Sequence, residues 1–196
     1  KINVYEAEKL LVEKINISGN SVTDESVIRS ELLLDEGDPY NKLKLDQTIA
    51  KIKARNIFAE VKQTTTEGAI KNQKIIGIEV EEKPTGEISA GAGIGTDGGS
   101  FSFNVSENNW LGKGINVKTN VDISKTRFSG GLNVTDPNYN FSGNSLTYFI
   151  NNTANDNANS GFKNNLTSFG VGTSFEQYRN IYLSPTIIYT YDDLKV

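Results

Sequence analysis

From residue 88 to residue 191, apolar side chains return at every second position within a series of short segments. In residues 88–94, isoleucine and alanine alternate with serine and glycine. A period of two is the pattern of a β-strand with one apolar and one polar face. The pattern predicts seven such strands, at 88–94, 100–106, 115–124, 127–134, 145–151, 166–175 and 180–191.

The first 83 residues combine two helical stripes with three alternating segments. A favourable N-cap at Thr23 is followed by an apolar stripe, which predicts a helix that continues to about residue 34. A second apolar stripe predicts a helix between Asn41 and Asn56, and asparagine can end it in the left-handed conformation. Alternation predicts strands at 11–17, 58–64 and 74–82. The expected order is strand–helix–helix–strand–strand, an α+β domain.

The composition changes at Pro84. The residues before it hold 28 of the 44 charged side chains, whereas the residues after it hold 14 of the 18 glycines. A change of this kind favours two domains, at 11–83 and 84–196. Residues 1–10 fit neither domain, and we interpret them as the end of a preceding domain or a linker. Because the chain begins with Lys1 and not with an initiator residue, we expect it to be a piece of a longer protein.

Composition also limits the chemistry. The chain has no cysteine and no histidine, which excludes a disulfide framework and a thiolate nucleophile and removes the commonest general base near neutral pH. We therefore expect that the protein is not an enzyme and that it holds no metal. A net charge of −4 argues against a partner of nucleic acid, which normally needs a basic surface.

Two architectures fit the alternating strands: a soluble sandwich and a transmembrane β-barrel. Aromatic residues collect in every second connection, at Trp110, at Tyr139 with Phe141, and at Tyr178. The other connections are mostly polar, and the longest of them is the asparagine-rich stretch 151–165, which we interpret as an outer loop. Aromatic residues at one rim are typical of a membrane interface and favour the barrel. Bacterial barrels have even strand numbers, so seven strands predict an incomplete barrel.

The residues around Pro84 resemble those of a known family. The stretch EEKPTGEISAGAGIGTDGGSFSFNVSENNWLGKG at 81–114 is similar to the junction between the last POTRA domain and the first barrel hairpin of the BamA family of outer-membrane protein assembly factors. KINISGN at 14–20 and the two-helix unit resemble a POTRA domain, which is built as βααββ. The sequence departs from the family at Asn56-Ile57-Phe58, where a glycine is more common than asparagine.

The resemblance implies a fold and a function. The fold class is an α+β POTRA domain followed by an all-β, antiparallel set of transmembrane barrel strands, located in the bacterial outer membrane with the POTRA domain in the periplasm. The implied function is assembly and insertion of β-barrel proteins, without a cofactor. The alternative is a POTRA-barrel secretion or translocation pore of the two-partner or autotransporter assembly type. A soluble two-domain adhesion or binding protein is a third class.

The resemblance also implies site residues. The first barrel strand would pair through its backbone edge with unfolded outer-membrane protein clients, at Gly86, Glu87, Ile88, Ser89, Ala90, Gly91, Ala92 and Gly93. Glu31 would contact a BamD-like lipoprotein subunit of the assembly complex, although it could equally be one more solvated charge. Trp110, Tyr139, Phe141 and Tyr178 would lie at the interface with outer-membrane lipid.

Overall fold

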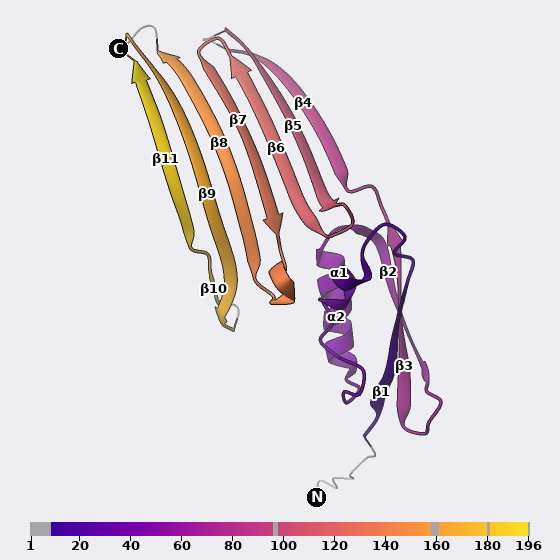
Figure 1. The fold of residues 1–196 in the computed structure, drawn as a ribbon. Coiled ribbons are helices and arrows are strands. Elements are labelled where there is room, and N and C mark those ends of the chain that lie inside the picture. Colours follow the sequence, from indigo (N-terminus) through magenta and orange to yellow (C-terminus); the bar gives the residue numbers. More distant parts are fainter. Residues whose placement is uncertain (1–8, 96–97, 158–160, 180, 196) are drawn as a thin grey trace, which may run out of the picture. The chain divides into compact units, whose positions relative to one another are not determined.

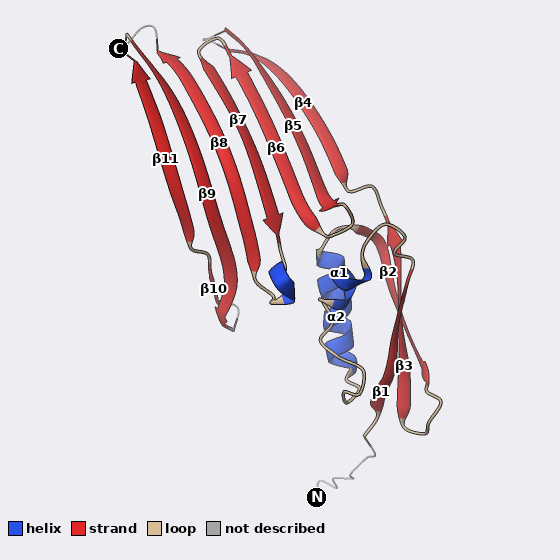
Figure 2. Ribbon diagram, in the orientation of Figure 1, coloured by secondary structure: helices blue, strands red, loops and turns tan. Residues whose placement is uncertain are grey.

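The computed structural model describes residues 9–95, 98–157, 161–179 and 181–195. Contacts divide the chain into two compact units, with the boundary in the sequence between Pro84 and Thr85. The first unit mixes helices and strands, and the second is built from strands with one short 3₁₀ turn (Figures 1 and 2). The predicted fold class, an α+β domain followed by an open antiparallel sheet, is confirmed.

The first unit is a three-stranded sheet with two helices on one face (Figure 1). Its elements are β1 (Leu11–Ser18), α1 (Glu25–Arg29), α2 (Lys42–Ala54), β2 (Phe58–Glu67) and β3 (Gln73–Glu82). The strand order is β1-β3-β2, with β1 parallel and β2 antiparallel to β3. Apolar residues of both helices meet alternate residues of the strands in one buried core, which includes Ile28, Ile52, Val12, Ile76 and Ile78.

Both predicted ends of the longer helix are confirmed. The Asn41 side chain accepts a hydrogen bond from the backbone N–H of Lys44 at 3.2 Å and caps the first turn of α2. Asn56 has φ of +56°, the left-handed conformation that asparagine tolerates after a helix end.

The expectation that the first helix continues to residue 34 is wrong. α1 ends at Arg29, and the Ser30 hydroxyl donates to the carbonyl of Val27 at 2.9 Å. A serine that bonds its own backbone in this way competes with helix propagation. Leu34 is still buried in the core, so the apolar stripe reflects burial in a turn rather than a continuing helix.

The second unit is one continuous antiparallel sheet (Figure 2). Its elements in chain order are β4 (Gly86–Gly95), β5 (Gly98–Trp110), β6 (Ile115–Ser124), β7 (Arg127–Asp136), η1 (Tyr139–Phe141), β8 (Ser145–Asn157), β9 (Phe162–Tyr178), β10 (Ile181–Leu183) and β11 (Thr186–Lys195). Sequential strands are neighbours from β4 to β9, and both β10 and β11 pair with β9.

Two details of the second unit differ from expectation. The strand predicted at 180–191 is broken at Ser184-Pro185, because proline has no N–H to give the ladder, although Leu183 and Thr186 keep one register on β9. The asparagine-rich stretch 151–165 is not simply a loop, because β8 and β9 extend into it. Cross-strand bonds explain this: the Asn152 amide donates to Asn165 at 2.7 Å and to Thr167 at 2.8 Å.

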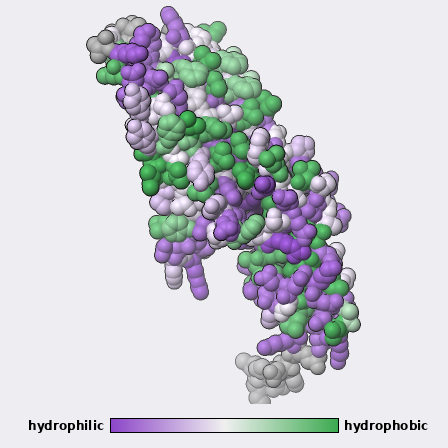
Figure 3. All heavy atoms as spheres, viewed as in Figure 1, coloured by the Kyte–Doolittle hydropathy of each residue, from purple (hydrophilic) through white to green (hydrophobic). Residues whose placement is uncertain are grey.

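Pairing in register gives the sheet an apolar face and a polar face. Phe103 opposes Ala90 and Val121, and further along the sheet Ile150 opposes Leu132 and Phe169. We define the apolar face by the large residues that share this side and remain exposed: Ile88, Phe101, Phe103, Ile123, Phe128, Leu132, Tyr148, Ile150, Phe169, Val171, Ile187 and Tyr189. Figure 3 shows hydrophobic residues over much of this unit. The residues between them form the polar face, where Asn104 opposes Asn120 and Asp122 opposes Ser129.

Glu82 fastens the end of β3 to the loop after β1. Its carboxylate accepts hydrogen bonds from the backbone N–H groups of Ser21, Val22 and Thr23 at 3.0, 2.9 and 2.6 Å. Burial alone would raise the pKa of Glu82, but the hydrogen bonds from Thr23, Ser21 and Val22 outweigh it and lower the pKa from 4.5 to about 2.

We predict that this anchor weakens in acid. A carboxylate with a lowered pKa contributes its stability above its unfolded pKa and loses it as the pH falls through the folded value. The free energy that protects the amides of residues 21–23 from hydrogen exchange should therefore be constant above about pH 5 and fall between pH 4.5 and the folded pKa of about 2. Glu82→Gln should lower it at pH 7 by about 1 kcal/mol, a modest value because the site is partly exposed.

The matched control is Glu81→Gln, which alters an exposed neighbour on the same strand. Equal losses of protection in the two variants would contradict the assignment of the anchor to Glu82.

Candidate functional site: an exposed edge strand and an aromatic rim

β4 is an edge of the sheet, with its ten residues exposed and β5 as its neighbour among the described residues. The two strands pair without a bulge from Gly86, opposite Glu107, to Gly95, opposite Gly98. Alternate residues of a strand direct their N–H and C=O groups to the same side, so half of the β4 backbone groups point away from β5. Such an edge is a template for another strand.

The side chains of β4 make few cross-strand contacts with those of β5. Four of its ten residues are glycine, and Ala90 and Ala92 oppose the much larger Phe103 and Phe101. A Cβ added at Gly91 would come within 2.9 Å of the Ser102 hydroxyl. Since cross-strand side-chain pairs contribute most of the stability of a ladder beyond its hydrogen bonds, this pair is held chiefly by its backbone.

The two ends of β4 are held differently. At its start, the Thr85 hydroxyl donates to the Glu107 carboxylate, and the N–H of Asn108 donates to the carbonyl of Thr85 at 3.3 Å. At its end, Ile94 faces Gly99 and is 95% exposed. Side-chain bonds therefore fix the beginning of the strand, while its end depends on backbone pairing between glycines.

The four aromatic residues predicted to mark a rim are all exposed. Trp110 ends β5, Tyr139 and Phe141 lie in η1 after β7, and Tyr178 ends β9. Because β5, β7 and β9 run in the same direction, their C-terminal ends lie along one rim of the sheet, as Figure 1 shows. Thr85, which precedes β4, lies at that same rim. The structure thus brings the aromatic residues together at one rim, and their contact with lipid stays a prediction.

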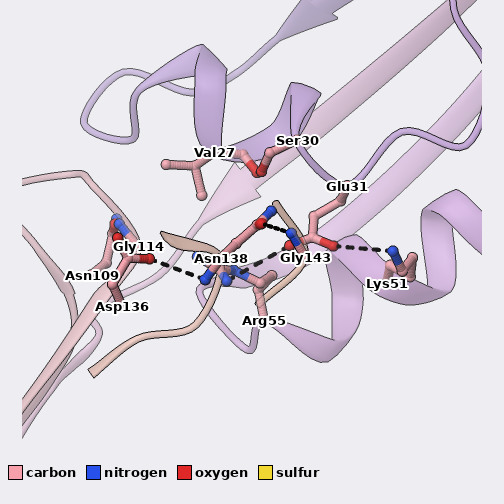
Figure 4. A network of polar contacts seen from close by, with 10 residues as sticks. All are labelled: Val27, Ser30, Glu31, Lys51, Arg55, Asn109, Gly114, Asp136, Asn138 and Gly143. Atoms are coloured by element: carbon pink, nitrogen blue, oxygen red, sulfur yellow. Dashed lines mark hydrogen bonds and ion pairs between the residues drawn. The ribbon is translucent and has the colours of Figure 1, made fainter. Parts of the chain in front are cut away.

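Glu31 is not one more solvated charge. It is 9% exposed, and its carboxylate lies 3.7 Å from both Lys51 Nζ in α2 and Arg55 Nη1 at the C-cap of that helix (Figure 4). The Arg55 side chain is 12% exposed, so this pair is shielded from water on both sides. Sequence reasoning missed these partners, although two basic residues four apart on one helix were the available signal. A contact of Glu31 with a lipoprotein subunit stays a prediction.

Hollows in the second unit follow its two faces. One of about 560 Å³ lies on the polar side beside β4 and is lined by residues that include Asp122, Arg127 and Ser129. Another of about 530 Å³ lies between apolar side chains that include Tyr148, Phe169 and Ile187. Within the described ranges, no group of three or more acidic, histidine or cysteine side chains is placed to hold a metal ion. Among the described helices, none is both long and apolar enough to cross a membrane.

Residues 10–83 match the POTRA family, described as "Surface antigen variable number repeat". The chain is 38% identical over 112 residues to the outer membrane protein assembly factor BamA of Neorickettsia risticii, which covers 56% of this chain. It is 30% identical over 151 residues to BamA of Neisseria meningitidis, which covers 76% of this chain. The chain spans 15% and 19% of the length of these two relatives.

Solved structures show the same fold. The crystal structure of BamA from Haemophilus ducreyi lacking POTRA domains 1–3 superposes with a TM-score of 0.81 at 23% identity, covering 97% of this chain and 37% of that one. CdiB from Acinetobacter baumannii superposes with a TM-score of 0.64 at 13% identity, covering 95% of this chain and 39% of that one.

We predict that Glu31→Gln destabilises the first unit more than Glu25→Gln does. Glu25 forms a shorter pair, 2.6 Å from Arg29, but both of its side chains are about half exposed and screened by water. Loss of the Glu31 carboxylate removes one negatively charged partner from the shielded Arg55 guanidinium, which should cost about 1–2 kcal/mol, whereas loss of Glu25 should cost about 0.5 kcal/mol or less. Urea unfolding followed by hydrogen exchange of the first unit measures both values, and the reverse order would contradict the role of burial.

Proposed function

Because this chain is a homologue of the BamA assembly factors and carries a POTRA domain, we propose that it takes part in assembling and inserting β-barrel proteins into a bacterial outer membrane. The sheet lies in that membrane and the POTRA domain in the periplasm. The role is that of a non-enzymatic binding surface. The observation that carries the proposal is the glycine-rich edge of β4, which pairs only with β5 among the described residues.

In this mechanism, a strand of the unfolded client adds to β4. Each backbone group of a client strand that enters lipid without a partner costs several kcal/mol, and pairing with the N–H and C=O groups of β4 that point away from β5 removes that cost. The small side chains of β4 also leave the arriving strand unobstructed on both faces. Recognition through the backbone fits clients of many sequences, with one face directed to lipid by the alternation of their own residues.

The two ends of β4 are held unequally, which gives the addition of a client strand a direction. The start of the strand is fixed by Thr85 and Glu107, while its end at Ile94 and Gly95 has no such side-chain bond among the described contacts. Separation from a neighbouring strand would therefore begin at the Gly95 end and proceed toward Gly86. A client strand would form its first bonds at the loosened end.

The lipoprotein partner proposed for Glu31 must meet a side chain that already has partners. Lys51 is the more accessible of the two, with a side chain that is 51% exposed, compared with 12% for Arg55. A lipoprotein subunit that binds here would reach Lys51 first and would take Glu31 only by weakening the pair with it. Loss of binding in a Glu31 variant therefore counts as a contact only if the first unit remains folded.

A secretion pore is the second candidate, and the likeness to CdiB favours it. In a pore, the substrate passes along the polar face instead of adding to an edge. The higher TM-score of the BamA structure, 0.81 against 0.64, favours assembly.

We predict that cysteines on β4 form disulfide bonds with a client strand. In an otherwise cysteine-free protein with its full length, Ser89→Cys on the polar side and Ala90→Cys on the apolar side should both crosslink to single cysteines in the client, because directly opposed strand residues bring Cα atoms within disulfide range. Stalled client and mild oxidation, followed by gel analysis, measure the yield.

The matched controls are Ser102→Cys and Phe103→Cys, which lie on β5 and already have strands on both sides. They should give little product. Crosslinks confined to polar-face positions on several strands, such as Asn120 and Ser129, would support the pore instead. Absence of crosslinks at every β4 position would reject strand addition.

A further inference from the structure

Two loops on the aromatic rim repeat one sequence pattern. Residues 107–114 read ENNWLGKG and residues 136–143 read DPNYNFSG. In each stretch, the first residue is acidic, the third is asparagine, the fourth is aromatic and the eighth is glycine. We refer to residues 107–114 and 136–143 as the rim loops. Sequence reasoning noticed their aromatic residues but not the repeat.

The positions that the two rim loops share make the same hydrogen bonds in both. The Asn109 side-chain oxygen accepts from the N–H of Gly114 at 2.7 Å, and that of Asn138 accepts from the N–H of Gly143 at 2.7 Å (Figure 4). The acidic residue completes the clamp from the other side, because Glu107 accepts from the N–H of Asn109 at 2.7 Å and Asp136 from that of Asn138 at 3.0 Å.

The clamp closes over a tip of two left-handed residues. In the first rim loop these are Leu111 and Gly112, with φ of +53° and +73°, and in the second they are Asn140 and Phe141, with φ of +53° and +54°. Two consecutive residues of this kind form the turn that normally contains asparagine and glycine. Each tip keeps one such residue, Gly112 or Asn140, but places a large apolar residue beside it.

Leucine and phenylalanine are poor choices for this backbone. A left-handed conformation costs a residue with a large side chain on the order of 1–2 kcal/mol, a cost that glycine avoids. Both residues are also mostly exposed, Leu111 at 74% and Phe141 at 64%, so they recover little by burial within the described residues. Strain without a packing gain, repeated in two loops, indicates that the tips serve contact with something outside the chain.

The position of the first rim loop and the aromatic residues of both loops point to lipid as the partner. Trp110 pairs with Ile115, which continues into the apolar face along β6, so the first rim loop extends that face beyond the strands. The Trp110 and Tyr139 rings beside the tips have the amphipathic character of residues at a bilayer interface. Lys113, exposed in the first rim loop, adds a positive charge at the level where anionic headgroups would lie.

We propose that the rim loops are two copies of one membrane anchor, in which the clamp on Asn109 or Asn138 holds Leu111 or Phe141 out of the turn for insertion into the adjacent phospholipid leaflet. The proposal rests on the outer-membrane location proposed above. Asn109 and Asn138 are positioning residues, and Leu111 and Phe141 make the contact. Two anchors on neighbouring connections of the same rim would fix its depth at two points and limit tilting of the sheet.

Spin labels test the depth of the tips. Single cysteines at Leu111, Phe141, Lys125 and Ile123 are labelled in the otherwise cysteine-free, full-length protein, reconstituted in vesicles of phosphatidylethanolamine and phosphatidylglycerol. Lys125 lies in the turn at the opposite rim, and Ile123 lies on the apolar face. The ratio of collision with oxygen to collision with a water-soluble nickel chelate should be severalfold higher at 111 and 141 than at 125.

The clamp is tested by Asn138→Ala with the label at 141. The collision ratio should fall toward that of position 125, while a label at 123 keeps its value and so shows that the sheet remains in the bilayer. Asn138→Asp, which retains the acceptor oxygen, should restore the high ratio. An unchanged ratio in Asn138→Ala would overturn the clamp.

The outcomes separate this proposal from the proposed function. A high ratio at 123 with water-like ratios at 111 and 141 would overturn the membrane anchor and leave the barrel intact. Water-like ratios at all four positions would overturn the outer-membrane location on which both depend.

Discussion

Antiparallel pairing in register, carried without interruption from β4 to β9, is the constraint on which the second unit depends. Side chains alternate between faces with a period of two, so a slip of one residue in any pair would move a whole strand's apolar residues to the polar side. The bulge after Glu107 lies at the rim, where it leaves the faces intact. Because parity is kept across six strands, exposed apolar residues become one surface suited to lipid.

The same ladder defines what each edge can do. An edge strand with large side chains is held by contacts with its neighbour, whereas β4 has few large side chains that could make such contacts. On the opposite side, β11 pairs with β9 from Thr186 to Lys195 and brings Ile187, Tyr189 and Tyr191 to the contact. The hydrogen bonds of Thr85 and Glu107 are then important, because they keep the weakly held β4 attached at one end. A strand that is fixed at its start and weakly held at its end can exchange partners repeatedly without leaving the sheet. A strand that is held firmly, or weakly, along its whole length is less suited to this exchange.

Much of this architecture could be predicted because the relevant interactions are local. Alternation located the strands, and Asn41 and Asn56 marked the ends of α2 from their own side-chain and backbone preferences. The errors arose where distant partners decide. Asparagine disfavours strands on average, yet Asn152 is stabilised across β8 and β9 by Asn165 and Thr167.

The sites divide in the same way. The aromatic rim follows from strand order, so Trp110 could be singled out in the sequence, whereas residues 86–93 were singled out by the resemblance to the BamA family. The burial of Glu31 between Lys51 and Arg55 depends on how a turn packs on α2, which periodicity does not encode. The rim-loop clamps were visible only as spacing, since a repeated asparagine and glycine acquire meaning once both are seen to form one hydrogen bond.

The most direct test of the account is a cysteine scan along β6 from Val117 to Ile123, with the full-length protein in phospholipid vesicles and a water-soluble maleimide as the probe. Val117, Thr119, Val121 and Ile123 share the apolar face, and Lys118, Asn120 and Asp122 share the polar one. Labelling should be slow at the four apolar-face positions and fast at the three polar-face positions, so that the rate alternates with a period of two. Labelling without alternation, or with the opposite phase, would contradict it.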